Sequence, residues 1–242
     1  MTDSEDARRE TTRAYDALAE RDATGWESPW SDNPLQRHYS WPATKAMLPE
    51  LDDRRVLDAG CGVGDHVEWL LDQGARVVGV DASEAAVGTA RDRFGDTDRA
   101  TFRRADLTEP LGFDDETFDA VLSHLVLDHV AELRPTFREF HRVLSDGGGL
   151  VFAVVHPMQY HAEYDAVEVY YDAAAVEVGW DDAAVTSYHR PMSELLNALV
   201  EAGFHLDEVA EPPPQAAFLE RAPDRWSPEE RPQIFCVRAR RE

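Results

Sequence analysis

The sequence VLDAGCGVGD, residues 56–65, decides the fold, because a short β-prone run leads directly into a loop with three glycines. Gly60, Gly62 and Gly64 let the backbone approach a ligand without interference from a Cβ atom. The helix expected after the loop offers free N–H groups at its start. A strand, a glycine loop and a helix in this order are typical of the first unit of a ligand-binding α/β sheet.

Outward from this loop, short apolar runs alternate with amphipathic helices. Such alternation predicts right-handed βαβ units and a mainly parallel, doubly wound sheet that is covered on both faces. The predicted strands are 55–59, 76–80, 101–105, 118–124 and 150–155, followed near the end of the chain by 204–209 and 233–239.

Capping residues and apolar stripes mark the helices between these strands. Asp65, with Glu68 three residues later, predicts the cap of the first helix, and Ser83 predicts the cap of the second. Apolar residues at spacings of three and four predict the remaining helices. These residues are Leu133, Phe137, Phe140 and Leu144 in one helix and Leu195, Leu196 and Leu199 in the helix 192–201.

Two segments fall outside this rhythm, and we expect both to belong to one domain that spans residues 1–242. Residues 1–50 predict an N-terminal helical and aromatic lid, with a helix over 5–21 and a loop over 26–41. Residues 156–190 are rich in aromatic and acidic side chains and show no clear period. We interpret them as an insertion that caps the substrate site, since long inserts at this edge of a sheet commonly carry function.

The charge of the chain is strongly one-sided. Its 242 residues include 48 acidic and 24 basic side chains, a net charge of −24, and Lys45 is the single lysine. Such a surface repels phosphate backbones and anionic lipids, which argues against nucleic-acid and membrane partners. High acidity with almost no lysine resembles proteins of salt-accumulating archaea and predicts a halophilic protein. The charged N-terminus and the two cysteines, Cys61 and Cys236, favour a cytoplasmic protein with free thiols.

Three acidic residues stand at the ends of three consecutive strands. Asp58 enters the glycine loop, Asp81 follows the second strand, and Asp106 follows the third. A carboxylate at the position of Asp81 can accept hydrogen bonds from ribose hydroxyls. A dinucleotide loop would need glycine at position 65, where Asp65 stands and would oppose a pyrophosphate. The acids are compatible instead with a ligand that carries an ammonium or sulfonium group.

Four stretches together resemble the successive motifs of class I S-adenosylmethionine-dependent methyltransferases, in the group that includes ubiquinone and menaquinone biosynthesis enzymes. They are VLDAGCGVG (56–64), GVDAS (79–83), RADL (104–107) and FDAVLSHLVLDHV (118–130), with a looser match over 188–204. The resemblance implies a Rossmann-like sheet of seven strands whose last strand, 233–239, is antiparallel. It also implies S-adenosylmethionine as cofactor and methyl transfer to a small-molecule acceptor by in-line displacement at the sulfonium methyl.

The resemblance assigns cofactor contacts residue by residue. Asp58, Gly60 and Gly62 would hold the methionine part, Asp81 the ribose, and Asp106 with Leu107 the adenine. Ser123 would border the methionine part, at the end of the fourth strand. The full set of expected cofactor-binding residues is Asp58, Gly60, Cys61, Gly62, Asp81, Ala82, Asp106, Leu107 and Ser123.

The sequence assigns no catalytic residue and no metal. A general base is needed only if the acceptor loses a proton in the transition state. The spacing of His124, Asp128 and His129 does not put three ligands on one helix face, which disfavours a metal site. The candidate residues of the substrate pocket are Tyr15, Tyr39, His124, His156 and His189.

Two alternatives to an active methyltransferase remain open. One is a non-catalytic subunit that binds S-adenosylmethionine and activates a partner, which the intact strand-end acids disfavour. The other is a nicotinamide-dependent oxidoreductase, which Asp65 disfavours. The oligomeric state does not follow from the sequence.

Overall fold

A computed structural model of the chain describes residues 3–22, 33–180, 183–221 and 231–242. Within these residues, the central sheet contains seven strands. They are β1 (Arg55–Ala59), β2 (Arg76–Asp81), β3 (Ala100–Arg104), β4 (Phe118–His124), β5 (Leu144–Val155), β8 (Phe204–Ala210) and β9 (Ile234–Arg241).

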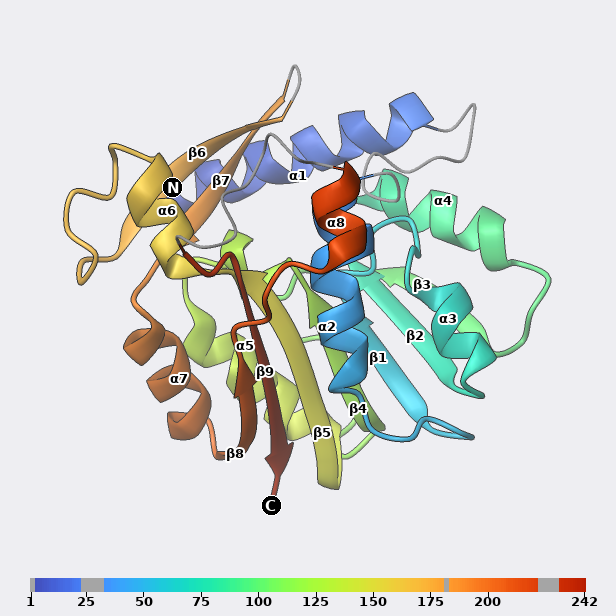
Figure 1. Cartoon of the computed structure of the whole chain (residues 1–242). Coiled ribbons are helices and arrows are strands. Elements are labelled where there is room, and N and C mark those ends of the chain that lie inside the picture. Colours follow the sequence, from blue (N-terminus) through green and yellow to red (C-terminus); the bar gives the residue numbers. More distant parts are fainter. Residues whose placement is uncertain (1–2, 23–32, 181–182, 222–230) are drawn as a thin grey trace.

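The sheet has the order β3-β2-β1-β4-β5-β9-β8 (Figure 1). Strands β3, β2, β1, β4 and β5 are parallel to their neighbours, whereas β9 is antiparallel to both β5 and β8. This arrangement confirms the predicted seven-stranded, mostly parallel sheet with an antiparallel last strand. Strand order reverses between β1 and β4, and ligands of such sheets bind beyond the carboxyl ends of the strands at that point.

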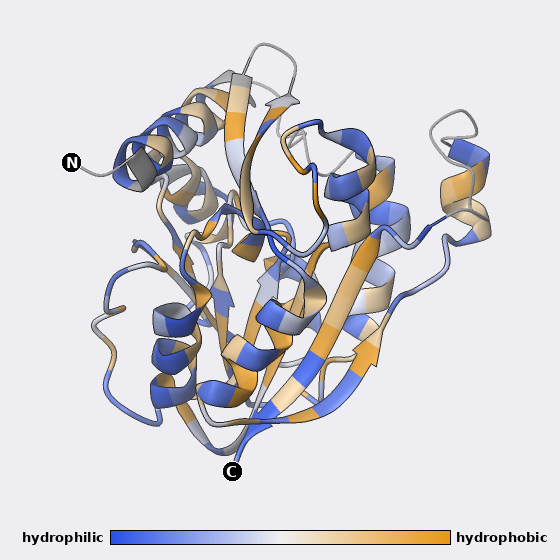
Figure 2. Cartoon of the chain, turned by 90° about the vertical axis from the view of Figure 1, so that its left-hand side faces the viewer, coloured by the Kyte–Doolittle hydropathy of each residue, from blue (hydrophilic) through white to orange (hydrophobic). Residues whose placement is uncertain are grey.

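Helices cover both faces of the sheet. The helices are α1 (Asp3–Asp22), η1 (Gln36–Ser40), α2 (Trp41–Ala46), α3 (Val67–Asp72), α4 (Glu84–Phe94), η2 (Leu127–His129), α5 (Leu133–Val143), α6 (Pro157–Glu163), α7 (Met192–Glu201) and α8 (Ala216–Arg221). Successive strand residues point to opposite faces, so Leu57 packs with α5 and α7 while Val56 packs with α3 and α4. Figure 2 shows the apolar strands between more polar helices.

A cap lies over the carboxyl ends of the strands. It consists of α1, α6 and an antiparallel hairpin of β6 (Ala174–Trp180) and β7 (Ala183–His189) (Figure 1). Strand β7 packs against both α1 and η2. Helix α1, from the N-terminal segment, and the hairpin, from insertion 156–190, therefore meet above the sheet.

Three sequence predictions differ from the structure. The segment after Asn33 is helical rather than a loop, with η1 running into α2, and residues 26–32 lie outside the described part. The first βα helix begins at Val67 after a series of turns, and no side chain caps it. Insertion 156–190 contains α6 and the hairpin. The alternation of buried and exposed residues in β7 is not visible in the sequence, because its buried positions include polar residues such as Ser187.

The predictions of the Ser83 cap and of free thiols are confirmed. Ser83 caps α4, accepting a hydrogen bond from the amide of Ala86 at 3.0 Å. Cys61 and Cys236 are free thiols, both buried. No helix in the described ranges is long and apolar enough to cross a membrane.

Candidate active site

The glycine loop after β1 has a backbone conformation that residues with a Cβ atom rarely adopt. Gly60, Gly62 and Gly64 have φ values of +89°, +53° and +85°. A Cβ atom on Gly60 would come within 2.3 Å of the Val126 side chain, whereas a Cβ on Gly62 would meet nothing within 4 Å. Gly60 therefore allows the loop to pack on the segment after β4. Gly62 leaves open space in front of the loop.

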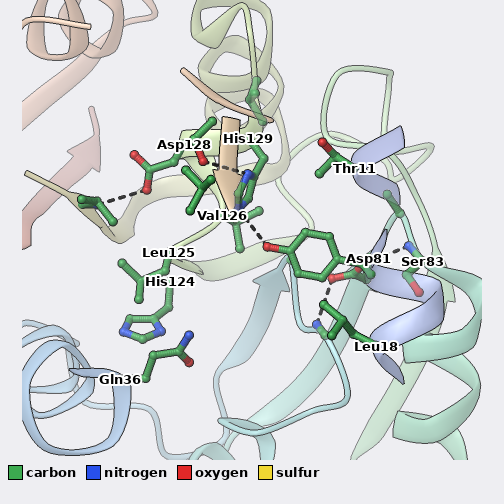
Figure 3. A pocket seen from close by; sticks show the side chains of 18 of the residues that line it. Thr11, Leu18, Gln36, Asp81, Ser83, His124, Leu125, Val126, Asp128 and His129 are labelled. Atoms are coloured by element: carbon green, nitrogen blue, oxygen red, sulfur yellow. Dashed lines mark hydrogen bonds between the residues drawn. The ribbon is translucent and has the colours of Figure 1, made fainter. Parts of the chain in front are cut away.

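Asp81 has both carboxylate oxygens held by backbone amides. Gly62 N–H donates to Oδ2 and Ser83 N–H donates to Oδ1, each at 2.9 Å (Figure 3). Each oxygen still has acceptor capacity for a ligand hydroxyl. Burial raises the pKa of Asp81, and the hydrogen bonds from Ser83 and Gly62 oppose that rise. The glycine loop and the end of β2 are thereby fixed relative to each other.

Asp106 lies after β3 in a local turn. Its Oδ1 accepts hydrogen bonds from the amide and the hydroxyl of Thr108, at 2.9 and 2.7 Å. Its Oδ2 lies 3.4 Å from the guanidinium of Arg8 on α1. Leu107 is buried beside it. The turn directs one carboxylate oxygen toward α1, which crosses above it.

Asp58 is buried beneath the glycine loop without a hydrogen-bond partner. Both of its carboxylate oxygens lack one among the described residues, and the side chain is 1% exposed. Burial, with the charges of Asp81 and Asp65, raises the pKa of Asp58 to about 7. A buried carboxylate is costly unless it is paired. This position therefore suits a nearby cationic ligand group or a proton.

Ser123 does not line the cavity described below. It is fully buried, and its hydroxyl donates to the carbonyl of Ala59 at 3.0 Å, which ties β4 to β1. Cys61 and Ala82 do line the cavity. Burial raises the pKa of the Cys61 thiol well above its usual value, so the thiol stays protonated.

Asp65 is paired rather than isolated. Its carboxylate lies 3.1 Å from the Arg93 guanidinium, and both side chains are mostly buried. The expected repulsion between Asp65 and a pyrophosphate assumes an uncompensated charge, and the ion pair weakens it. Sequence spacing does not reveal the pair, because Arg93 comes from the far end of α4.

A cavity of about 730 Å³ lies between the strand ends and the cap. Two walls enclose it, and we name them by their origin. The strand-end wall comprises Gly60, Cys61, Gly62, Val63, Asp81, Ala82, Ser83, Asp106, Leu107 and Thr108. The cap wall comprises Tyr15, Asp128, His129, Tyr160, Tyr164 and Ser187, from α1, η2, α6 and β7.

The cap wall contains a hydrogen-bonded pair from distant segments. The Tyr15 hydroxyl lies 2.8 Å from Nε2 of His129, and Nδ1 of His129 lies 2.9 Å from the Thr186 carbonyl. The two rings meet edge-on, with centroids 5.5 Å apart. Burial lowers the pKa of His129, so the imidazole is neutral near pH 7. The chain thus places a neutral histidine and a phenol on the surface of the cavity.

Asp128 is a buried carboxylate on the cap wall. Its Oδ2 accepts a hydrogen bond from the Val155 amide at 3.0 Å (Figure 3). Burial raises its pKa to about 7, against the lowering effects of the Val155 amide, the Arg190 charge and the Tyr160 hydroxyl. From the sequence, Asp128 is a candidate only for a disfavoured metal site, because nothing in the motif reveals its burial.

Arg190 holds the turn that carries Asp128 and His129. Its guanidinium donates to the carbonyls of Val130, Ala131 and Leu127 at 2.5, 3.2 and 3.4 Å. The side chain is 7% exposed. Since Arg190 follows β7 directly, its hydrogen bonds connect the hairpin to the turn after β4, as does the contact between His129 and Thr186.

His124 lies in the floor of the cavity. Its Nε2 is 3.0 Å from the Ser40 hydroxyl, and its ring packs edge-on against His66, with centroids 4.7 Å apart. Burial lowers the pKa of His124 well below its usual value and that of His66 to about 4. Both imidazoles are therefore neutral. Trp41 packs on His66 but does not itself line the cavity.

The other three predicted pocket residues do not line the cavity. Tyr39 is buried on η1 and donates to the Pro212 carbonyl at 2.7 Å. His156 caps α6, and its Nε2 lies 2.8 Å from Glu211. His189 is buried at the end of β7, with Nε2 2.9 Å from the Tyr170 carbonyl. Each stabilises the cap or its base rather than facing the cavity.

The cavity is anionic. Among the described residues that line it, Arg8 is the one Lys or Arg side chain, and the ion pairs with Asp106 and Glu109 engage it. The acids that line it are Asp65, Asp81, Asp106, Asp128 and Glu163. No group of three or more His, Cys, Asp or Glu within the described ranges could hold a metal ion. The walls therefore favour a cationic organic ligand.

These features fit S-adenosylmethionine, whose sulfonium, ammonium and carboxylate give it a net positive charge and which also contains a ribose and an adenine. The orphaned carboxylate of Asp58, the open space before Gly62 and the acids after β2 and β3 match its cationic groups, its ribose and its adenine. The sequence profile of the family described as "Methyltransferase domain" matches residues 57–152. A solved S-adenosylmethionine dependent methyltransferase from Mesorhizobium loti is 32% identical, with a TM-score of 0.69, and the alignment covers 84% of this chain and 97% of that one.

The chain belongs to the class I S-adenosylmethionine-dependent methyltransferases. It is also similar to two curated relatives. A demethylmenaquinone methyltransferase of Clavibacter sepedonicus is 40% identical over 108 residues, which are 45% of this chain and 43% of the relative. A ubiquinone biosynthesis O-methyltransferase of Alkalilimnicola ehrlichii is 32% identical over 146 residues, 59% and 58% of the two chains. The methyltransferase thus spans about half the length of these relatives, and its cofactor is S-adenosylmethionine.

Proposed function

We propose that this methyltransferase transfers a methyl group to a small, uncharged or cationic acceptor that binds against the cap wall. The observation that carries the proposal is the anionic cavity of about 730 Å³ between the two walls. It has room for a small molecule beside the cofactor. The relatives named for quinone biosynthesis support a small acceptor. An acceptor with a phosphate or carboxylate would meet five acids, of which Asp65 and Asp106 are paired with arginines, and it would find no unengaged Lys or Arg side chain among the described lining residues.

The strand-end wall holds the cofactor in this proposal. Asp81 accepts hydrogen bonds from the ribose hydroxyls, while Asp106 and Leu107 contact the adenine. Asp58 lies beneath the methionine part, near Gly62. The geometry of Asp81 supports its role, because backbone amides orient both oxygens before any ligand arrives.

The sulfonium of bound S-adenosylmethionine supplies an activated methyl group. The chain therefore needs to align the acceptor and exclude water, which can account for several kcal/mol of the barrier. The cap is suited to both tasks. Strand β7 packs on α1 and η2, and Arg190 fastens the hairpin to the turn after β4. We infer that insertion 156–190, with α1, closes the acceptor site.

Metabolite profiling with an isotopically labelled methyl donor tests the proposal. Extracts incubated with wild-type protein should yield a labelled small molecule without phosphate or carboxylate groups. The Asp81→Ala variant should give much less label, and Asp92→Ala, which changes an exposed acid on α4, should match wild type. Label found only in RNA or protein, or in a phosphorylated acceptor, would contradict the proposal.

A further inference from the structure

The pair formed by Tyr15 and His129 has a defined proton arrangement. The Thr186 carbonyl can only accept, so the 2.9 Å contact places the imidazole proton on Nδ1 of His129. Nε2 then carries a lone pair and accepts the Tyr15 O–H at 2.8 Å. Ser187 Oγ lies 3.4 Å from the same Nδ1. The backbone of β7 therefore fixes which nitrogen is basic.

The basic nitrogen points toward the cavity side of the cap. Both Tyr15 and His129 line the cavity, and the Nε2 position is filled by the Tyr15 hydroxyl. The phenol oxygen directs its own proton at His129 and can still accept a hydrogen bond. A ligand hydroxyl that approaches this part of the cap wall thus meets an oxygen acceptor that is linked to a base.

We propose that Tyr15 and His129 form a proton relay for an acceptor that is methylated on a hydroxyl oxygen. This inference rests on the proposed function, because it assigns the chemical class of the acceptor. Tyr15 is the catalytic residue that touches the acceptor. His129 receives the proton through Tyr15.

Every bond and proton of the reaction is accounted for when the relay operates. The acceptor O–H bond breaks as the O–CH3 bond forms, while the C–S bond of the donor breaks and leaves its electron pair on sulfur. The acceptor proton passes to the Tyr15 oxygen, and the Tyr15 proton passes to Nε2 of His129. His129 becomes an imidazolium that later releases its proton to solvent. Tyr15 ends the cycle as a phenol again.

A weak base suits a hydroxyl better than an amine. An oxygen keeps a lone pair for attack while its proton is still attached, so proton loss can accompany methyl transfer. An ammonium must lose its proton before it can attack, and the lowered pKa of His129 makes it a poor base for that step. A free amine already has a lone pair and needs no base. The relay therefore serves an O–H acceptor.

Charged and titratable groups around the pair support these protonation states. Burial, together with the charges of Asp81 and Asp128, raises the pKa of Tyr15 well above its usual value, so it remains a phenol. Tyr160 and Arg190 also face this region. Burial raises the pKa of Tyr160, which therefore stays a phenol, and Arg190 interacts electrostatically with Asp128.

Histidine NMR tests the relay without any acceptor. In protein loaded with S-adenosylhomocysteine at pH 7, the His129 nitrogens should show a neutral ring protonated at Nδ1. The His129→Gln variant assigns the signals, and Tyr15→Phe should shift the Nε2 resonance. A ring protonated at Nε2, or charged at pH 7, would overturn the proposal, because Nε2 could not then take a proton.

Kinetics with the acceptor found by isotope profiling provides the second test. Tyr15→Phe and His129→Gln should each lower kcat at least about a hundredfold, with the KM for the donor changed less than about threefold. Wild-type kcat/KM should fall as pH drops through the lowered pKa of His129, below about 6.5. His129→Gln should lack this limb, which a merely structural role would not remove.

Two surface variants serve as controls. Tyr171→Phe and His205→Gln change exposed side chains outside the cavity and should keep wild-type kinetics. A product methylated on nitrogen or carbon would overturn the hydroxyl assignment while leaving the proposed function intact. Wild-type rates in both relay variants would overturn the relay itself. If wild-type protein does not bind S-adenosylmethionine at all, the proposed function itself is refuted.

Discussion

The two walls of the cavity differ in how the chain builds them. The strand-end wall comes from loops that follow consecutive strands, and several of its contacts are local, such as Ser83 to Asp81 and Thr108 to Asp106. The cap wall joins Tyr15 to His129, which are 114 residues apart in sequence. The first wall is made by short motifs, and the second exists only after the whole chain has folded. In the proposed function, the first wall binds the donor and the second wall selects the acceptor.

Removing the part of the cap that residues 156–190 form should produce the largest difference between methyl transfer and donor binding. Replacing residues 156–190 by a short Gly-Ser linker should reduce methyl transfer by at least about a thousandfold, because alignment and water exclusion are lost. Binding of S-adenosylhomocysteine, measured by calorimetry, should stay within a few-fold of wild type. If donor binding collapses as well, the two walls are not separable and the segment is part of the core.

The glycine loop offers a matched pair of substitutions within the strand-end wall. Gly60→Ala should cost about 2–4 kcal/mol of unfolding free energy, because a positive φ is strained and the new Cβ would collide with Val126. Gly62→Ala has the φ strain alone and should cost about 1 kcal/mol. The second variant should nevertheless lose donor affinity, since its Cβ would occupy the open space. Urea unfolding and calorimetry measure both effects, and equal stability losses would contradict the packing difference.

Much of the strand-end wall could be predicted from sequence because its determinants are short. Strands β1 and β4 begin and end where the apolar runs predicted, and the acids at 81 and 106 face the cavity. Ser123 shows the limit of the same reasoning. The apolar pattern of β4 predicts that Ser123 is buried. It does not predict that the Ser123 hydroxyl donates to the Ala59 carbonyl instead of facing the cavity.

The cap wall could not be predicted because its contacts depend on chain segments far apart. His156 and His189 were expected in the pocket, yet both are committed to hydrogen bonds that shape α6 and the end of β7. Tyr160 and Ser187 face the cavity and were missed. No local pattern distinguishes these two pairs, since which side of a hairpin is inward depends on where α1 packs.

Salt tests a property that both walls share. A net charge of −24 opposes compaction through repulsion between like charges. Salt weakens this repulsion, because the Debye screening length falls from about 10 Å at 0.1 M to about 3 Å at 1 M salt. The melting temperature should rise by more than about 10 °C between 0.1 and 2 M KCl, roughly 3 kcal/mol for a domain of this size. Thermal melts over a KCl series measure it. A flat curve would contradict a halophilic protein while leaving the comparison of the walls unchanged.

The pH dependence of stability should reveal the buried carboxylate beneath the strand-end wall. The folded-state pKa of Asp58, about 7, lies above the ordinary value near 4. The unfolded chain therefore releases a proton over this interval that the folded protein keeps, so stability falls as pH rises from about 4 to about 7 and then levels off.

Asp58→Asn should remove this contribution. Between pH 5 and 7.5, the stability of the variant relative to wild type should increase by about 2 kcal/mol, as measured by urea unfolding. Asp92→Asn, on the surface of α4, should show no such trend. Parallel pH curves for wild type and Asp58→Asn would mean that Asp58 is ionised and paired in the folded protein.

Calorimetric titration with S-adenosylhomocysteine tests the central claim most directly, namely that the strand-end wall holds the donor. Asp81→Ala loses two hydrogen bonds to a charged acceptor, each of about 1.5–3 kcal/mol and partly replaced by water. Its affinity should fall about ten- to a hundredfold, while Asp92→Ala should bind as wild type does. Unchanged affinity in Asp81→Ala would contradict the assignment of the donor to this wall.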